Sequence, residues 1–133
     1  MLVDDNPEDN FFHERGIKLN NPDNIVLKKN SAAKALEYLG STKGEDPHPD
    51  LILLDINMPG MNGWEFLEAY KRMDRGAGRR PIIIMLTTSE NPDDAAKAKG
   101  LAFVSDYISK PLTEEIMKGI IDAYFVKPGQ TAP

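Results

Sequence analysis

Leu51-Ile52-Leu53-Leu54-Asp55 is the stretch that decides the fold, because four apolar residues in a row are followed directly by an acid. A continuous apolar run predicts an inner strand of a parallel sheet, which helices cover on both faces. A second run of this kind extends from Pro81 to Leu86. Two such runs indicate a sheet whose central strands are wholly buried.

Helical patterns lie between and around these two runs, often begun by a capping residue and a proline, as at Asn6-Pro7 and Asn91-Pro92. We expect further strands at residues 1–3, 24–27 and 107–108, and helices at 7–19, 31–40, 64–73, 91–100 and 113–124. In the last helix, the predicted core positions are Ile116, Ile120, Ile121 and Tyr124. Right-handed crossovers would place the helices on both faces of one parallel sheet. The predicted fold class is therefore α/β, flavodoxin-like and doubly wound, with strand order 2-1-3-4-5.

The composition sets limits on the class of protein. A chain of 133 residues fits a single domain, which we expect to span residues 1–126, followed by a flexible tail at 127–133. The net charge of −5 argues against direct nucleic-acid binding. Without cysteine, a basic leader or an apolar run of about 20 residues, the expected location is the cytoplasm, with no membrane insertion. The first strand is unusually short, which leaves open that N-terminal residues are missing.

Chemically competent side chains follow four of the expected strands. These side chains are Asp4 and Asp5 after the first strand, Asp55 at the end of the third, Thr87 and Thr88 at the end of the fourth, and Lys110 after the fifth. Carboxyl ends of parallel strands share one edge of the sheet, so these groups should converge on one pocket. His13 and His48 lie outside this set, and both are expected to be solvated.

Three carboxylates in a small volume repel one another, so they must hold protons or a cation. Oxygen ligands without histidine or cysteine select Mg²⁺, Mn²⁺ or Ca²⁺ over zinc, and Mg²⁺ readily takes phosphate oxygens as further ligands. Lys110 adds a positive charge and Thr87 a hydroxyl. The set predicts a site for a phosphoryl group, in which a carboxylate can be the nucleophile.

Four motifs, in order and at strand ends, closely resemble the receiver domains of bacterial two-component response regulators. They are Val3-Asp4-Asp5-Asn6-Pro7, residues 54–63 around Asp55, Met85-Leu86-Thr87-Thr88-Ser89 and Tyr107-Ile108-Ser109-Lys110-Pro111. The resemblance covers nearly the whole chain, to about Phe125. It implies a stand-alone, CheY-like receiver that is not an enzyme in the usual sense, because it catalyses only its own phosphorylation and dephosphorylation.

The resemblance also implies a role for each matching residue. Asp55 would be the phosphoacceptor and Lys110 its cationic partner, while Thr87 and Tyr107 would form the switch. The metal would be Mg²⁺, bound by Asp5, by Asp55 and by the backbone carbonyl of Asn57, with Asp4 holding a metal-bound water. Pro111 matches a proline that follows a cis peptide bond. The segment from Thr87 to Lys110 is about one residue longer than the family pattern, so Thr88 is an alternative switch hydroxyl.

The implied partners are a sensor histidine kinase or a histidine phosphotransfer protein as donor, and an unidentified protein as target, with the chain itself a monomer or weak dimer. Two other hypotheses compete. One is a Mg²⁺-dependent phosphohydrolase with an aspartyl-phosphate intermediate, although Asn57 stands where its second acid is expected. The other is a pseudo-receiver that binds partners without phosphorylation.

Overall fold

A computed structural model describes residues 1–41, 48–73, 81–88, 92–101 and 103–125. Its strands are β1 (Leu2–Val3), β2 (Lys28–Lys29), β3 (Leu51–Asp55), β4 (Ile82–Thr87) and β5 (Asp106–Ser109). Its helices are α1 (Pro7–Asn20), α2 (Ala32–Ser41), α3 (Gly63–Arg72), α4 (Pro92–Lys99) and α5 (Glu114–Tyr124). The predicted tail at residues 127–133 and the loop at 42–47 lie outside the described residues.

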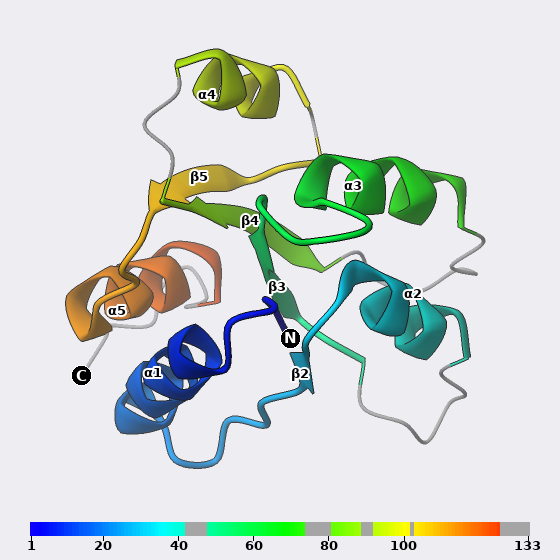
Figure 1. The fold of residues 1–133 in the computed structure, drawn as a ribbon. Helices are drawn as coiled ribbons and strands as arrows, with labels where there is room; N and C mark the ends of the chain where they lie inside the picture. The colour runs from blue at the N-terminus through cyan, green and yellow to red at the C-terminus, as the bar shows by residue number, and fades with distance from the viewer. Residues whose placement is uncertain (42–47, 74–80, 89–91, 102, 126–133) are drawn as a thin grey trace.

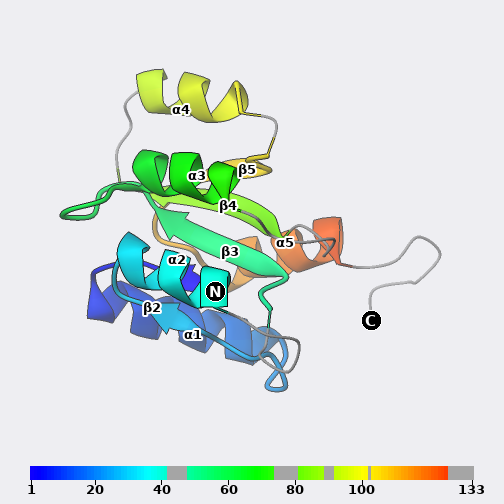
Figure 2. The same ribbon diagram turned by 90° about the vertical axis from the view of Figure 1, so that its right-hand side faces the viewer.

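All five strands are parallel and lie in the order β2-β1-β3-β4-β5, as predicted. β3 pairs with β4 from Leu51↔Ile82 to Asp55↔Leu86, and β4 pairs with β5 up to Thr87↔Ser109. Figure 1 shows α1 and α5 together on one side of the sheet and α2 and α3 on the other, and Figure 2 shows α4 at the β5 end. The doubly wound fold is confirmed.

Alternate residues of the central strands belong to two separate hydrophobic cores, one on each face of the sheet. Ile52 and Leu54 point to the cluster beneath α2, α3 and α4, where Phe66 and Leu67 pack. Leu53 and Ile84 point to the other cluster, beneath α1 and α5, with Met117 and Ile120. Because burial on both faces needs apolar residues at every position, the continuous runs predicted these two strands correctly.

Several elements differ from the prediction in their bounds or in the face that they bury. The second strand is Lys28–Lys29 rather than 24–27, because β1 offers only Leu2 and Val3 as pairing partners, and they pair with Lys28 and Lys29. In α5 the fully buried positions are Met117 and Ile120; Ile116 and Ile121 are half-buried, and Tyr124 is 38% exposed. The helix is rotated so that a methionine takes the deepest position, which an isoleucine-based pattern misses.

α1 also differs, because its inner face is mostly polar. Asn10 and His13 are buried there, and Ile17 packs against the core next to them. The expectation that His13 is solvated was therefore wrong, since its spacing from Asn10 and Ile17 places it on the inner stripe of the helix. His48 is exposed, as predicted. The outer face of α1 instead carries Phe11 and Phe12, which are 67% and 49% exposed.

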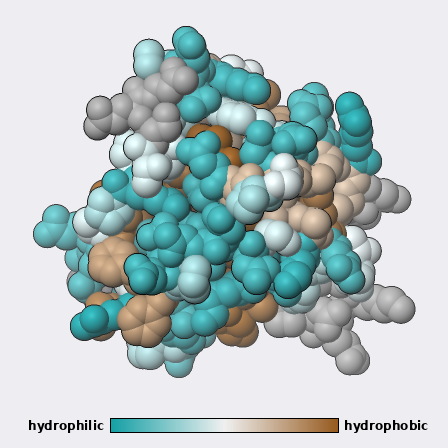
Figure 3. Space-filling model, viewed as in Figure 1, coloured by the Kyte–Doolittle hydropathy of each residue, from teal (hydrophilic) through white to brown (hydrophobic). Residues whose placement is uncertain are grey.

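In the space-filling view of Figure 3, hydrophilic side chains cover most of the visible face, and apolar side chains show between them in several separate places. Within the described ranges, no helix combines the length and apolar character needed to cross a membrane.

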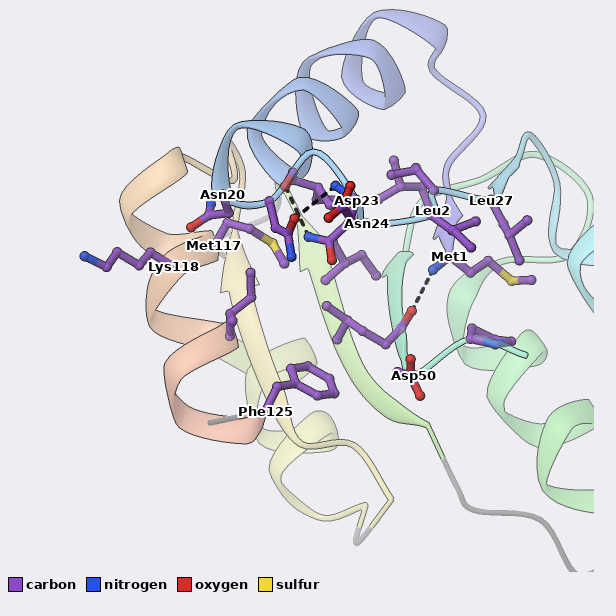
Figure 4. A pocket seen from close by; sticks show the side chains of 18 of the residues that line it. Met1, Leu2, Asn20, Asp23, Asn24, Leu27, Asp50, Met117, Lys118 and Phe125 are labelled. Atoms are coloured by element: carbon purple, nitrogen blue, oxygen red, sulfur yellow. Dashed lines mark hydrogen bonds between the residues drawn. The ribbon is translucent and has the colours of Figure 1, made fainter. Parts of the chain in front are cut away.

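A cavity of about 850 Å³ lies at the amino end of the sheet, away from the strand ends that carry the acids. Its walls come from β1, from the segment after α1 and from α5, as the labelled Leu2, Asn24 and Met117 show in Figure 4. The amino group of Met1 donates a hydrogen bond to the Leu51 carbonyl at 2.6 Å. Apolar side chains such as Leu2 and Met117 line this cavity together with polar and charged ones such as Asn24, Asp50 and Lys118.

Candidate functional site

The predicted acids come together at the carboxyl edge of the sheet. One carboxylate oxygen from each of Asp4, Asp5 and Asp55 lies within 4.8 Å of the others. β1 and β3 are neighbours and register Val3 with Leu54, so the residues that follow are brought side by side. Asp4 and Asp55 are only 3% and 6% exposed, whereas Asp5 faces solvent.

Lys110 reaches into the same site from the end of β5. Its Nζ donates to Asp4 Oδ2 at 2.7 Å and lies 3.6 Å from Asp55 Oδ1. It also donates to Asp9 Oδ2 at 2.9 Å. The contact with Asp9 was not predicted. The sequence does place Asp9 near the site, because it lies in the first turn of the helix that follows Asp4 and Asp5. No local pattern, however, indicates that Lys110 contacts it.

Local structure holds Asp4 in place. Its carboxylate accepts a hydrogen bond from the backbone N–H of Asn6 at 2.9 Å, and its carbonyl accepts one from the side chain of Asn10 at 2.9 Å. The side chain of Asn6 caps α1 by accepting from the N–H groups of Glu8 and Asp9. The positive end of the α1 dipole therefore lies directly after the acid pair, where it favours negative charge.

Gly63 fixes the other side of the site. A Cβ at this position would lie 2.8 Å from the Asp55 carbonyl oxygen and 2.9 Å from Ile56 Cα, closer than real contacts allow. The Gly63 N–H donates to the Ile56 carbonyl at 2.9 Å. The start of α3 thus packs directly on the backbone that carries Asp55, which only glycine permits.

Burial and mutual repulsion change the acidity of the central carboxylate. Burial, together with the charge of Asp4, raises the pKa of Asp55 from 3.8 to about 6, although Lys110 opposes the shift. Burial alone would lower the pKa of Lys110, but its hydrogen bonds to Asp4 and Asp9 outweigh burial and raise it. Lys110 is therefore a fixed positive charge, and Asp55 is a carboxylate whose negative charge is poorly compensated.

The remaining predicted residues surround this centre. Thr87 is the last residue of β4 and is fully buried, whereas Thr88 is exposed and outside the strand. Asn57 is exposed, and its backbone N–H donates to Asp55 Oδ1 at 3.3 Å. Tyr107 is half-buried and pairs with Met85, so it lies on the same face of the sheet as Thr87, two residues further along β4. The Lys110–Pro111 peptide bond is cis, as expected.

The donor set fits a hard divalent cation. Three carboxylates, all of them oxygen donors, converge, and burial together with the charge of Asp4 raises the pKa of Asp55. A divalent cation would compensate that charge, and oxygen ligands suit Mg²⁺. Asp5 is exposed enough to bind an ion that keeps several of its waters.

Comparison with known proteins identifies the family of the chain. Residues 1–122 match the family model described as the response regulator receiver domain. The chain is 33% identical over 119 residues to the two-component response regulator ORR1 of Oryza sativa subsp. japonica, a match that covers 84% of the chain and 48% of that protein. The chain thus spans about half the length of this relative.

Solved structures of response regulators are also similar to this chain. A two-component response regulator from Cytophaga hutchinsonii superposes with a TM-score of 0.82 at 30% identity, covering 92% of each chain. The phosphorylated cyanobacterial phytochrome response regulator RcpA has a TM-score of 0.77 at 30% identity, covering 92% of this chain and 90% of its own. The chain belongs to the response regulator receiver domain family of two-component signalling, whose members are generally not classical enzymes.

Proposed function

We propose that the chain accepts a phosphoryl group on Asp55 from a phosphohistidine donor, a sensor histidine kinase or a histidine phosphotransfer protein, in a reaction that requires Mg²⁺. The observation that carries the proposal is the convergence of Asp4, Asp5 and Asp55 on one side and Lys110 on the other. RcpA, which is similar over most of this chain, is described as phosphorylated.

The chemistry follows from the charges at the site. A carboxylate oxygen of Asp55 attacks phosphorus; the new O–P bond forms as the P–N bond of the donor breaks, and the imidazole nitrogen keeps the electron pair and takes up a proton from water. Lys110 lies within 3.6 Å of Asp55 and so can stabilise charge on the transferred oxygens. Hydrolysis later returns the Asp55 carboxylate and free phosphate.

Asp5 and Asp55 would hold the metal directly together with the backbone carbonyl of Asn57, and Asp4 would bind it through water. When bound, Mg²⁺ supplies positive charge to the phosphoryl oxygens and relieves the repulsion among the acids.

The switch would use Thr87 and Tyr107. Thr87 is better placed than Thr88, because it ends β4 next to Leu86, the residue paired with Asp55, and shares a face of the sheet with Tyr107. A phosphoryl group on Asp55 draws the Thr87 hydroxyl towards it, and Tyr107 turns inward into the space that is vacated. The surface formed by α4, β5 and α5 then binds its protein target differently, as a shift between two pre-existing states.

The wider setting is part of the same proposal. The receiver spans residues 1–126, acts in the cytoplasm as a monomer or weak dimer, and signals by binding a protein rather than by direct contact with nucleic acid. A phosphohydrolase acting on external substrates is disfavoured, because Asn57 cannot serve as the second acid. A pseudo-receiver is disfavoured by the presence of both the acids and Lys110.

The experiment is labelling with acetyl phosphate, a small phosphoryl donor, with and without Mg²⁺. The intact protein should incorporate one phosphoryl group only when Mg²⁺ is present, and Asp55→Asn should incorporate none. Asp122→Asn, which changes an exposed acid on α5, is the matched control and should label normally. Equal labelling of Asp55→Asn and the unaltered protein would refute the assignment.

A further inference from the structure

The third acid that contacts Lys110 is not explained by the phosphoryl-transfer site itself. Asp9 lies outside the cluster of Asp4, Asp5 and Asp55 that is able to hold a metal. Its carboxylate nevertheless lies 2.9 Å from Lys110 Nζ, nearer than Asp55 at 3.6 Å. The two hydrogen bonds of the lysine therefore go to Asp4 and Asp9, and its ion pair with Asp55, the acid that would receive the phosphoryl group, is longer.

The position of Asp9 is well fixed. Its backbone N–H is capped by the Asn6 side chain at 3.3 Å, and α1 is tied to β1 by the hydrogen bond from Asn10 to the Asp4 carbonyl. The Asp9 side chain is 35% exposed, whereas that of Lys110 is 9% exposed. Lys110 thus has little freedom, and a carboxylate on the rigid first turn of α1 holds its ammonium towards the helix.

We infer that Asp9 is a positioning residue that restrains Lys110 before phosphorylation, so that its carboxylate competes with the incoming phosphoryl group for the lysine. This inference rests on the proposed function of Asp55. An ammonium group has three N–H donors. Two are directed at Asp4 and Asp9, which leaves one for a phosphoryl oxygen at Asp55, and that oxygen has to attract the ammonium against the pull of Asp9.

Removing the Asp9 carboxylate should increase the rate at which Asp55 is labelled. Lys110 keeps Asp4 as a hydrogen-bond partner, and a negative charge that repels the arriving phosphoryl group is lost. Asp9→Asn should therefore be labelled by acetyl phosphate about threefold to fivefold faster than the unaltered protein, the upper part of the range expected of one partly exposed charge pair. It should also bind beryllofluoride, a non-covalent analogue of the phosphoryl group, more tightly by a similar factor.

Two further variants separate positioning from charge and from folding. Glu8→Gln removes the same charge from the neighbouring residue of the first turn, which is exposed. It should change the labelling rate less than twofold. Asp9→Glu restores a carboxylate and should return the rate towards that of the unaltered protein. A gain in rate is not produced by partial unfolding, and thermal unfolding curves of every variant verify that each is folded.

The outcomes separate the two proposals. If the unaltered protein is labelled at Asp55 and Asp9→Asn is slower, or no faster than Glu8→Gln, the role of Asp9 is wrong and the phosphoacceptor site stands. If the unaltered protein takes no label at all, the proposed function fails and the role of Asp9 fails with it. Faster labelling of Asp9→Asn alone, reversed in Asp9→Glu, supports the inference.

Discussion

The body of the central strands and the carboxyl ends of these strands are built on different principles. In the body of the strands, apolar side chains such as Ile52, Leu54 and Ile84 are fully buried and stabilise the fold by leaving water. At the carboxyl end, Asp4 and Asp55 are buried together against one lysine, an arrangement whose desolvation costs free energy. The difference shows that stability comes from the body of the strands, whereas the strand ends hold charges that only a ligand can compensate fully.

The largest expected effect tests the apolar body of the strands. Ile52 is fully buried in the body of β3, and Ile52→Ala should lower the free energy of unfolding by about 3 kcal/mol, through lost burial and the cavity left behind. Ile25→Ala is the control, because Ile25 is 72% exposed and should cost less than about 0.5 kcal/mol. Urea denaturation measures both. Equal costs for the two variants would contradict the described core.

The next effect concerns Gly63, where α3 packs on the backbone that carries Asp55. Gly63→Ala should lower the free energy of unfolding by about 1–3 kcal/mol, because the new Cβ meets the Asp55 carbonyl, which cannot move independently of the strand. It should also slow labelling at Asp55. Gly16→Ala is the control: nothing lies within 4 Å of a Cβ there, and alanine in the middle of α1 should stabilise by about 0.5–1 kcal/mol. If Gly63→Ala had the same free energy of unfolding and the same labelling rate as the unaltered protein, α3 would not constrain the site.

The smallest effect has the opposite sign and tests the carboxyl end. The pKa of Asp55 is raised to about 6 in the folded protein from an ordinary 3.8, so the folded state binds more protons between these values. Stability should therefore fall as the pH rises from about 4 to 6, and the full loss should be present at pH 7. In metal-free buffer, Asp55→Asn should be about 1–2 kcal/mol more stable than the unaltered protein at pH 7, and the gain should disappear near pH 4.

The matching control is again Asp122→Asn, an exposed position that should show no such pH-dependent gain. Thermal unfolding followed across the pH range measures the difference. An Asp55→Asn variant that is less stable at pH 7 would mean that Lys110 compensates the buried carboxylate more than its burial and the neighbouring acids destabilise it.

The sequence predicts most strongly where local pattern and topology agree. The apolar runs ending at Asp55 and Thr87 identify the central strands, and the rule that ligands bind at carboxyl ends of strands brings Asp4, Asp5 and Lys110 to the same edge. Motifs that lie directly at strand ends can therefore be predicted from the sequence alone.

What the sequence could not supply depends on pairing partners and side-chain direction. The position of β2 depends on which residues of β1 face it, and the burial of His13 depends on which stripe of α1 faces the core. The contact between Asp9 and Lys110 joins residues 101 positions apart, through side chains that no local pattern relates.

The most direct test of the central claim locates the phosphoryl group chemically. Borohydride reduces an aspartyl phosphate to an alcohol, so protein treated with acetyl phosphate and Mg²⁺ and then reduced should carry homoserine at position 55, as read by peptide mass spectrometry. The account predicts this conversion at Asp55 alone and none without Mg²⁺. Conversion at another acid, or a labelled protein with an unmodified Asp55, would contradict it.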